Sequence, residues 1–230
     1  MINMLSRRFS RPKGVIGMIA GYIMAAENQT LNQWTINQLG ITRGDSILEV
    51  GFGPGYCMQQ MLKREKDVHL HGIDVSEAML KLAARRVKPK GVRLIQGSIE
   101  TFPLPASFYD KVISVNNYTI WNDQTKGMKQ IYRALKPGGK AAITMQPREA
   151  DASPEKTKSF GRQIIADFKA AGFEDIDIQF KNIKPELSVC ATAKKPPPKK
   201  GGGASSFMNV QPDCAGRLFS PCQGCFSAVR

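Results

Sequence analysis

Short runs of β-branched residues, separated by segments with helical spacing, fill the chain from residue 46 onward. The runs predict five strands in series, at Ser46–Val50, Val68–Ile73, Val92–Gln96, Lys111–Val115 and Lys140–Met145. The intervening segments predict helices at Cys57–Lys66, Ser76–Val87 and Gln124–Leu135. Because strands alternate with helices here, the pattern favours βαβ units and a mostly parallel sheet.

The alternation changes near residue 174, where two strand-like runs follow one helix. The helix is predicted over Thr157–Ala171 and ends at Gly172. The two runs, Glu174–Phe180 and Leu187–Ala193, are too close together for a parallel crossover, so they predict an antiparallel hairpin. We therefore expect an α/β fold, a Rossmann-like seven-stranded sheet that is mostly parallel. It ends in a C-terminal antiparallel hairpin, with helices on both faces and an N-terminal helical cap.

Two further segments with apolar residues precede this region. Val15–Ala26 follows a basic start and resembles the apolar part of a signal peptide, but it is too short to span a bilayer as a helix. The next segment, "ENQTLNQWTINQLG", has helical spacing and closes at Gly40, a typical C-cap. We expect a pair of helices packed against the domain of a cytoplasmic protein without a transmembrane segment. The alternative is an exported protein in which residues 1–26 act as a signal peptide.

The composition changes abruptly after Ala193, to "KKPPPKKGGGASS". Lys and Pro followed by Gly and Ser are typical of a linker. We predict three parts: a basic segment with cap helices over residues 1–44, a domain over 45–193, and a linker with a disordered or accessory tail over 194–230. An altered reading frame is an alternative origin of the tail.

The net charge of +14 and the pI near 9.7 raise the question of an anionic partner. Residues 1–13 contribute +4 and residues 194–230 contribute +5, so only +5 is left for the 180 residues between them. Because the charge is concentrated at the two ends, the domain itself is only mildly basic. The sequence therefore disfavours a nucleic-acid partner.

The five cysteines are an odd number, which does not suggest a secreted disulfide framework. The tail sequence "CQGC" has a spacing that suits a metal, with Cys214 as a third thiol. A structural zinc site needs four ligands, and no histidine lies nearby. We therefore predict no metal site.

The stretch "ILEVGFGPG" places Gly51, Gly53 and Gly55 directly after the first predicted strand. Glycine lets the backbone take positive φ values and approach a ligand closely, and ligands of open α/β sheets bind beyond the carboxyl ends of the strands. Dinucleotide-binding loops read G-x-G-x-x-G, whereas this loop reads G-x-G-x-G with Tyr56 at the last position of that fingerprint. The loop therefore predicts a ligand site that differs from a pyrophosphate cradle.

Two carboxylates accompany the loop. Glu49 lies two residues before Gly51, where its negative charge would oppose a phosphate and suit a cationic amine. Asp74 ends the second strand, where a carboxylate can accept hydrogen bonds from the vicinal hydroxyls of a ribose.

Six segments, in order, now carry a family resemblance: "ILEVGFGPG", "HGIDVSEAMLKLA", "LIQGSIETFPL", "YDKVISVNNYTIW", "RALKPGGKAAI" and "FKAAGFEDIDI". They resemble the successive motifs of class I S-adenosylmethionine-dependent methyltransferases, over about residues 45–193. The resemblance implies S-adenosyl-L-methionine as the cofactor. It also implies methyl transfer as the activity.

The resemblance also implies roles for the residues around the loop. Glu49 would hold the methionine amine, directly or through water. Asp74 would bind the ribose hydroxyls, and Val75 would pack on the adenine. The backbone would pass under the methionine and ribose at Gly51, Gly53 and Gly55.

Further roles fall after the third and fourth strands. Ser98 and Ile99, in "QGSIE", would line the adenine edge, although the family often has an aspartate where Ser98 stands. Asn116, at the end of the fourth strand, would face the methionine part of the cofactor or the incoming nucleophile.

Each of these residues also has a structural interpretation. Asp74 is placed to cap the helix that starts near Ser76, and Glu49 to be a surface carboxylate. Asn116 suits a turn at a strand end. Tyr118 and the nearby Trp121 are aromatic residues of the core or of a substrate wall.

Methyl transfer from a sulfonium needs binding and alignment from the protein, and a general base only for an unreactive acceptor. The two histidines, His69 and His71, lie too far back in the second strand, since His71 is about 10 Å from Asp74. We therefore expect structural histidines and an acceptor that is a small molecule with a reactive nucleophile. The "NNYTIW" segment, which replaces the D/N-P-P-Y loop of many N-methylating relatives, disfavours a nucleobase or amide acceptor.

The sequence assigns no catalytic residue, but it offers candidates in two segments of the chain. Asn116 and Tyr118 follow the fourth strand, whereas Tyr22 and Glu27 belong to the N-terminal cap, which by resemblance would fold over the cofactor as a lid and exclude water.

Three other functions remain open. An RNA or protein methyltransferase would use the basic ends to hold an anionic partner. A membrane-surface or scaffold protein would keep the fold without turnover. A nicotinamide dehydrogenase would use the glycine loop for a dinucleotide.

Overall fold

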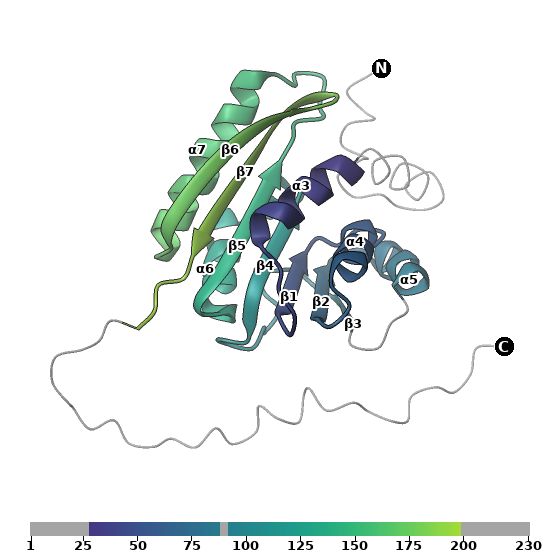
Figure 1. The fold of residues 1–230 in the computed structure, drawn as a ribbon. Helices are drawn as coiled ribbons and strands as arrows, with labels where there is room; N and C mark the ends of the chain where they lie inside the picture. Colours follow the sequence, from purple (N-terminus) through teal and green to yellow (C-terminus); the bar gives the residue numbers. More distant parts are fainter. Residues whose placement is uncertain (1–27, 88–91, 199–230) are drawn as a thin grey trace, which may run out of the picture. The chain divides into compact units, whose positions relative to one another are not determined.

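Seven strands hydrogen-bond in the order β3-β2-β1-β4-β5-β7-β6 in the computed structural model, which describes residues 28–87 and 92–198 (Figure 1). Their bounds are β1 Ser46–Val50, β2 His69–Asp74, β3 Val92–Gln96, β4 Tyr109–Val115, β5 Leu135–Met145, β6 Glu174–Ile183 and β7 Glu186–Lys194. The pairs among β1 to β5 are parallel, and β7 is antiparallel to both β5 and β6. The predicted fold class, including the C-terminal hairpin, is confirmed.

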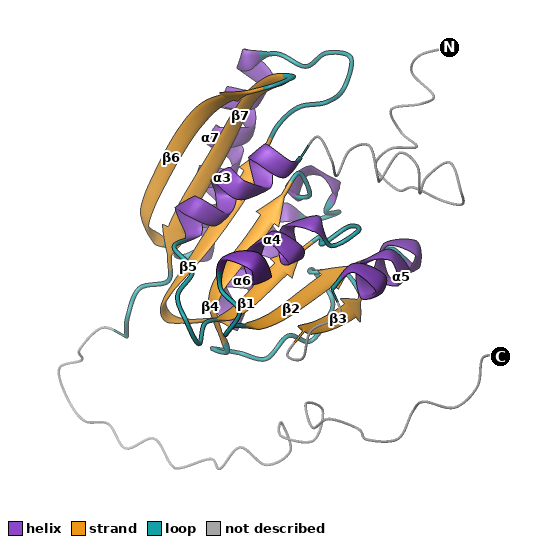
Figure 2. Cartoon of the chain, turned by 45° about the vertical axis from the view of Figure 1, so that its right-hand side comes forward, coloured by secondary structure: helices purple, strands orange, loops and turns teal. Residues whose placement is uncertain are grey.

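Helices cover both faces of this sheet (Figure 2). Their bounds are α3 Gln29–Leu39, α4 Tyr56–Arg64, α5 Glu77–Arg86, α6 Gln124–Ala134 and α7 Pro154–Ala171, with a short 3₁₀ helix η1 at Tyr118–Ile120. Alternate strand residues point to opposite faces: Ile47 joins a core with α3, α4 and α5, and Leu48 joins one with α6 and α7. The two faces of β1 therefore serve two separate hydrophobic cores.

Local chemistry explains several helix ends. The side chain of Ser76 accepts from Met79 N at the start of α5, and those of Asp123 and Ser153 do the same for α6 and α7. Gly40 and Gly172 end α3 and α7 in the left-handed conformation, as predicted from the sequence.

Four strands, β4 to β7, are longer than the sequence pattern predicted. β5 begins at Leu135 rather than Lys140, because Leu135 pairs with Tyr109 across a register shift. The hairpin also leaves only two residues between β6 and β7, since Ile183 pairs with Glu186. β6 forms the outer edge of the sheet and is mostly exposed. The residues after Phe180 therefore carry no alternation of buried and exposed positions that would have extended the predicted strand.

The N-terminal helix α3 lies along the sheet face rather than over its end, next to β4, β5 and β7 (Figure 1). It buries Leu31, Trp34, Ile36 and Leu39. One helix of the predicted N-terminal pair is thus present, and Val15–Ala26, the other, lies outside the described residues. Across the described residues, no helix is both long and apolar enough to cross a membrane.

Candidate functional site

The glycine loop connects β1 to α4 at the carboxyl edge of the sheet, as predicted. All three loop glycines have positive φ, at 76° for Gly51, 49° for Gly53 and 83° for Gly55, a region that L-residues with side chains rarely adopt. Gly55 is the N-cap of α4 and also lies close to α5, where a Cβ on it would stand 3.0 Å from Val87. The loop therefore needs glycine for its conformation and, at residue 55, for the packing of two helices.

Asp74 fastens the loop to the end of β2. One carboxylate oxygen accepts from Gly53 N and the other from Ser76 N, both at 2.9 Å. Burial raises the pKa of Asp74, although these two hydrogen bonds oppose the rise. The N-cap of α5 is Ser76 and not Asp74, whose carboxylate joins the backbone of Ser76 to the glycine loop.

Glu49 is buried in β1 with only 3% of its surface exposed, which excludes a surface carboxylate. Burial and the neighbouring charge of Asp74 raise its pKa well above the ordinary value. Within the described part of the chain its Oε2 atom has no hydrogen-bond partner. A buried oxygen without a partner is unfavourable, so this carboxylate is poised for a donor.

A pocket lies beside the loop, at the carboxyl ends of β1, β2 and β3. Five residues predicted from the sequence line it: Gly51, Asp74, Val75, Ser98 and Ile99. They are joined by Val50, Ile73, Gly97, Glu100, Asn117, Ile120, Trp121 and Asn122. Four other predicted residues, namely Glu49, Gly53, Gly55 and Asn116, lie next to this pocket in the chain but outside its lining.

Val75 stands out at the pocket rim, because it is one of the few large apolar side chains that are exposed, at 53%. It directly follows Asp74, whose carboxylate lies against the loop. An exposed apolar side chain beside convergent polar groups is a common feature of ligand pockets.

Glu100 is a pocket residue that the sequence analysis missed. It is 6% exposed, and its Oε1 accepts from Asn122 N at 2.5 Å and from Asp123 N at 3.2 Å. Its Oε2 accepts from the hydroxyl of Ser98. The available signal was an acidic residue shortly after the third strand, in the same "QGSIE" segment that supplied Ser98.

Asn117 and Trp121 also line the pocket. Trp121 Nε1 donates to Asn117 Oδ1 at 2.6 Å. Trp121 thus serves both the core and the pocket, since it is 7% exposed and stacks edge-on against Tyr118. The sequence analysis gave Asn117 no role in the site, because nothing local distinguishes its amide from that of Asn116.

Asn116 lies in the left-handed region at φ 51°, at the end of β4. Its side chain donates to Asn28 Oδ1 at 3.1 Å and accepts from Gln146 N at 2.8 Å. Arg148 donates to the same Asn28 oxygen at 2.7 Å and to Gln146 Oε1 at 3.0 Å. Asn116 therefore ties the end of β4 to β5 and to the start of α3.

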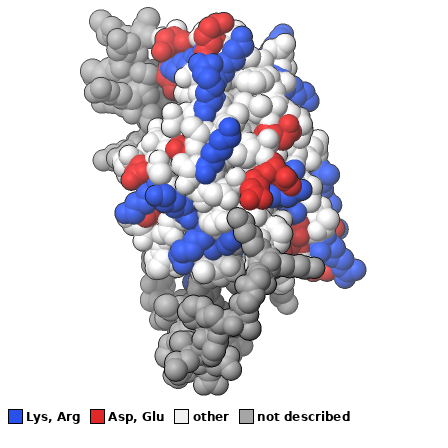
Figure 3. Space-filling model, turned by 90° about the vertical axis from the view of Figure 1, so that its left-hand side faces the viewer, with Lys and Arg blue, Asp and Glu red and all other residues white. Residues whose placement is uncertain are grey.

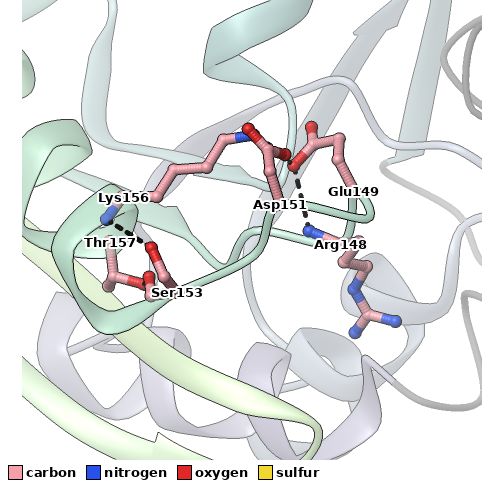
Figure 4. Close-up of polar contacts among 6 residues, drawn as sticks. All are labelled: Arg148, Glu149, Asp151, Ser153, Lys156 and Thr157. Atoms are coloured by element: carbon pink, nitrogen blue, oxygen red, sulfur yellow. Dashed lines mark hydrogen bonds and ion pairs between the residues drawn. The ribbon is translucent and has the colours of Figure 1, made fainter.

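The loop that follows Arg148 has its own ion pairs, shown in Figure 4. Lys156 Nζ lies 3.1 Å from Glu149 and 2.6 Å from Asp151, and Lys156 N bonds to Ser153. The guanidinium of Arg148 points away from this cluster (Figure 4). The ion pairs therefore hold the start of α7, and Arg148 belongs to the network around Asn116.

The remaining candidates lie away from the pocket lining. Tyr118 is 2% exposed and donates to Asp167 on α7; burial and Asp167 together raise its pKa. His71 pairs with Tyr109 Oη at 3.0 Å and stacks on Phe108, while burial lowers its pKa to about 4. His69 is exposed.

Two catalytic candidates and the cysteine motif of the tail belong to parts of the chain that the structure does not describe. Tyr22, Glu27 and the tail cysteines lie outside the described residues. Among the residues that are described, no cluster of His, Cys, Asp and Glu could hold a metal ion.

Comparisons with known proteins identify the family of this chain. A family model described as "Methyltransferase domain" matches residues 47–139. An uncharacterized methyltransferase of Bacillus subtilis (strain 168), YdaC, is 99% identical over 178 residues, which are 77% of this chain and 98% of that protein.

More distant relatives carry more specific names. The 2-methyl-6-phytyl-1,4-hydroquinone methyltransferase 1 of rice (Oryza sativa subsp. japonica) is 28% identical over 149 residues, 62% of this chain and 44% of that protein. Phosphoethanolamine N-methyltransferase 2 of Haemonchus contortus, solved with phosphomonomethylethanolamine and S-adenosylhomocysteine, has a TM-score of 0.61 at 22% identity. The match covers 73% of this chain and 52% of that one. The chain thus spans about half the length of these two proteins.

Proposed function

This chain belongs to the S-adenosylmethionine-dependent methyltransferases of the class I fold, and we propose that it transfers the methyl group of that cofactor to a small-molecule acceptor. The observation that carries the proposal is the pair of carboxylates around the glycine loop. Glu49 is buried with an oxygen that lacks a partner in the described chain, and Asp74 holds the loop from the other side.

The two carboxylates fit the two polar parts of the cofactor. A cationic amine supplies the donor and the positive charge that the buried Glu49 oxygen lacks. Each Asp74 oxygen accepts one backbone N–H, and a carboxylate has about four lone-pair sites. Asp74 can therefore accept two ribose hydroxyls without giving up the loop.

The glycine loop and the pocket rim fit the remaining parts of the cofactor. Gly51, Gly53 and Gly55 would present main chain without side chains to the methionine and ribose. Val75, already exposed, would cover one face of the adenine, and burying it would remove apolar surface from water. Ser98 and Ile99 would line the adenine edge.

The bound cofactor supplies a methyl group on a sulfonium, which reacts by in-line displacement. The protein contributes binding and alignment, and a near-attack geometry is worth about 7–11 kcal/mol. Neither histidine lies in the pocket lining, and Tyr118 and Asn116 are engaged with Asp167, Asn28 and Gln146. An acceptor whose nucleophile is already reactive needs no base from these residues, and any base from the N-terminal segment would be Tyr22 or Glu27.

Two relatives support a small-molecule acceptor, because their names specify a hydroquinone and a phosphoethanolamine compound. The competing proposal, an RNA or protein acceptor, depends on the charge of the two chain ends. Figure 3 shows the face of the molecule that carries α7 and β6, where Lys and Arg are interspersed with Asp and Glu. Among the described residues of that face, basic and acidic side chains are mixed rather than gathered into one basic surface.

A direct test is incubation of the full chain with donor labelled in the methyl group and a fractionated metabolite extract. The proposal predicts one or a few labelled small molecules, and Asp74→Ala should remove the label from them. Label that appears only in RNA or protein fractions, and falls steeply with added salt, would favour the competing proposal. Absence of binding to S-adenosylhomocysteine in calorimetry would contradict both.

A further inference from the structure

β6 is an edge strand. Among the described residues the strand order ends at β6, which hydrogen-bonds to β7 on its inner side. Figure 1 and Figure 2 both show β6 at the rim of the sheet. A bulge interrupts its pairing with β7 between Glu174 and Asp177, where Asp175 has a positive φ of 49°. From Asp177 to Ile183 the register is regular, and the outer backbone groups of such an edge can pair with another strand.

On the side of α7, this regular segment presents an apolar row. Ile178 and Phe180 approach Gly161 of α7, where a Cβ would stand 2.7 Å from Ile178 Cδ1 and 3.5 Å from Phe180 Cζ. Phe180 is nevertheless 44% exposed, and it is one of the few large apolar side chains that are exposed among the described residues. The cover that α7 gives to this row is therefore incomplete at Phe180.

On the side of α3, the same segment presents a polar row of opposite charges. Lys181 Nζ lies 6.0 Å from the ring centroid of Trp34 on α3, and Gln179 Nε2 donates to Asp177 Oδ2 at 3.1 Å. Alternation along a strand places Asp177, Gln179 and Lys181 on one face, and all three are exposed. An acid and a base thus stand two residues to either side of Gln179.

This arrangement is complementary to itself. We propose that β6 is the interface with a second copy of this chain, which adds its own β6 in antiparallel orientation about a two-fold axis at Gln179. Asp177 then faces Lys181 of the second copy, and the symmetry repeats the pair in the other direction. On the other face, Ile178 and Phe180 face each other in the same reciprocal way, which covers the exposed Phe180 ring.

The charges select this register over its neighbours. Residues that face each other across an antiparallel pair lie on the same face of the sheet, so the register can shift only in steps that keep the two faces separate. An axis at Phe180 would place Asp177 against Ile183 and leave both charges without an opposite charge. An axis at Ile178 would place Lys181 against Asp175, which belongs to the bulge. The axis at Gln179 pairs both charges within the regular segment.

The interface is separate from the candidate site. The pocket lies at the carboxyl ends of β1, β2 and β3, whereas β6 is the last strand at the opposite edge of the sheet. The proposal therefore stands on its own, whether or not the proposed function is correct.

Sedimentation velocity of the full chain over a concentration series tests the proposal. The natural chain should form a dimer whose fraction rises with concentration. Asp177→Lys and Lys181→Asp should each raise the dissociation constant roughly tenfold or more, because each places like charges opposite each other twice in the symmetric dimer. A mixture of the two variants should form heterodimers, since every pair across the interface is then Lys against Asp. Lys129→Glu, at an exposed position of α6, is the control and should dimerise like the natural chain.

A crosslink tests the register. Residues that face each other in an antiparallel pair have Cα atoms about 4.5–5.5 Å apart, a distance that a disulfide spans. Gln179→Cys should therefore oxidise to a dimer joined through residue 179 of both copies, as identified by mass spectrometry of the linked peptide. Asn182→Cys, also exposed on β6 but far from its own copy across the axis, should not form the corresponding link.

Each result decides for or against this dimer. A natural chain that stays monomeric at every concentration, or a dimer that neither charge reversal weakens, would overturn the proposal. A link through residue 182 in place of 179 would exclude the register. If a charge-reversal variant does not fold, as judged by circular dichroism, the Gln179→Cys crosslink decides.

Discussion

The side-chain amide of Asn117 lies directly against the α-carbon of Gly51. A Cβ at residue 51 would stand 2.1 Å from Asn117 Cγ and Nδ2, far inside van der Waals contact. Asn117 is held there by Trp121, which donates to its Oδ1 atom. Gly51 thus has two independent reasons to be glycine, its positive φ and this contact.

Replacement of Gly51 by Ala should separate the two reasons when it is compared with Gly44→Ala. Gly44 also has positive φ, at 82°, but a Cβ there would meet nothing within 4 Å. We expect Gly51→Ala to lower the free energy of unfolding by about 1–3 kcal/mol more than Gly44→Ala does. Urea titrations measure both values. Equal losses would mean that Asn117 moves aside freely.

Asp74→Ala should weaken the binding of S-adenosylhomocysteine by about 1.5–3 kcal/mol, the range for hydrogen bonds to a charged group. It also removes the acceptor for Gly53 N, so part of the loss reflects a looser loop. Calorimetry on Asp74→Ala and on the control Glu77→Gln measures the effect. Unchanged affinity in Asp74→Ala would remove this residue from the site.

Glu49 should make the unliganded protein less stable as the pH rises. Its pKa is raised in the folded state, so the folded protein binds more protons than the unfolded chain between the ordinary Glu value and the raised one. The free energy of unfolding should therefore fall with pH across that window. Glu49→Gln, which does not titrate, should flatten this slope and weaken cofactor binding roughly tenfold to a hundredfold. Urea titrations at several pH values and calorimetry check the two effects, and an unchanged slope would contradict the burial of an ionisable Glu49.

His71 should produce the opposite pH dependence. Its folded pKa is about 4 because of burial, below the ordinary 6.5, so the unfolded chain binds the proton first as the pH falls. Stability due to the neutral His71 is complete above pH 6.5 and is lost between pH 6.5 and about 4. His71→Gln should reduce this acid loss, as measured by thermal unfolding, whereas His69→Gln, at an exposed position of the same strand, should not. A similar change in both variants would contradict the assignment.

Tyr118→Phe should affect stability and spare the chemistry. The hydroxyl of Tyr118 donates to Asp167, which is 5% exposed, and its loss leaves that carboxylate with Thr125 and Gln163 as its side-chain donors among the described residues. We expect a loss of about 1–3 kcal/mol in the free energy of unfolding, with turnover per folded molecule unchanged once the acceptor is known. A large fall in kcat with a normal fold would make Tyr118 catalytic.

The sequence alone determined the order of the elements and the place of the loop. β1 and β3 have the predicted bounds, and the hairpin follows from the short interval between its two strands. These features depend on the hydrophobic periodicity, on the positions of glycine and on the lengths of the connections. All three can be read from residues that are close together in the sequence. Asp74, Val75, Ser98 and Ile99 lie in the pocket lining because they end or closely follow neighbouring parallel strands.

Tertiary structure decided what each side chain does there. The strand order brings β4 beside β1, so Asn117 meets Gly51 across 66 residues of chain, and Asn116 meets Asn28 across 88. Glu100 is fixed by the backbone of Asn122 and Asp123 at the start of the next helix. Periodicity reports which face a residue occupies, but not which distant group it contacts. The burial of Glu49 and the contacts of Glu100 therefore emerge only when the sheet is assembled.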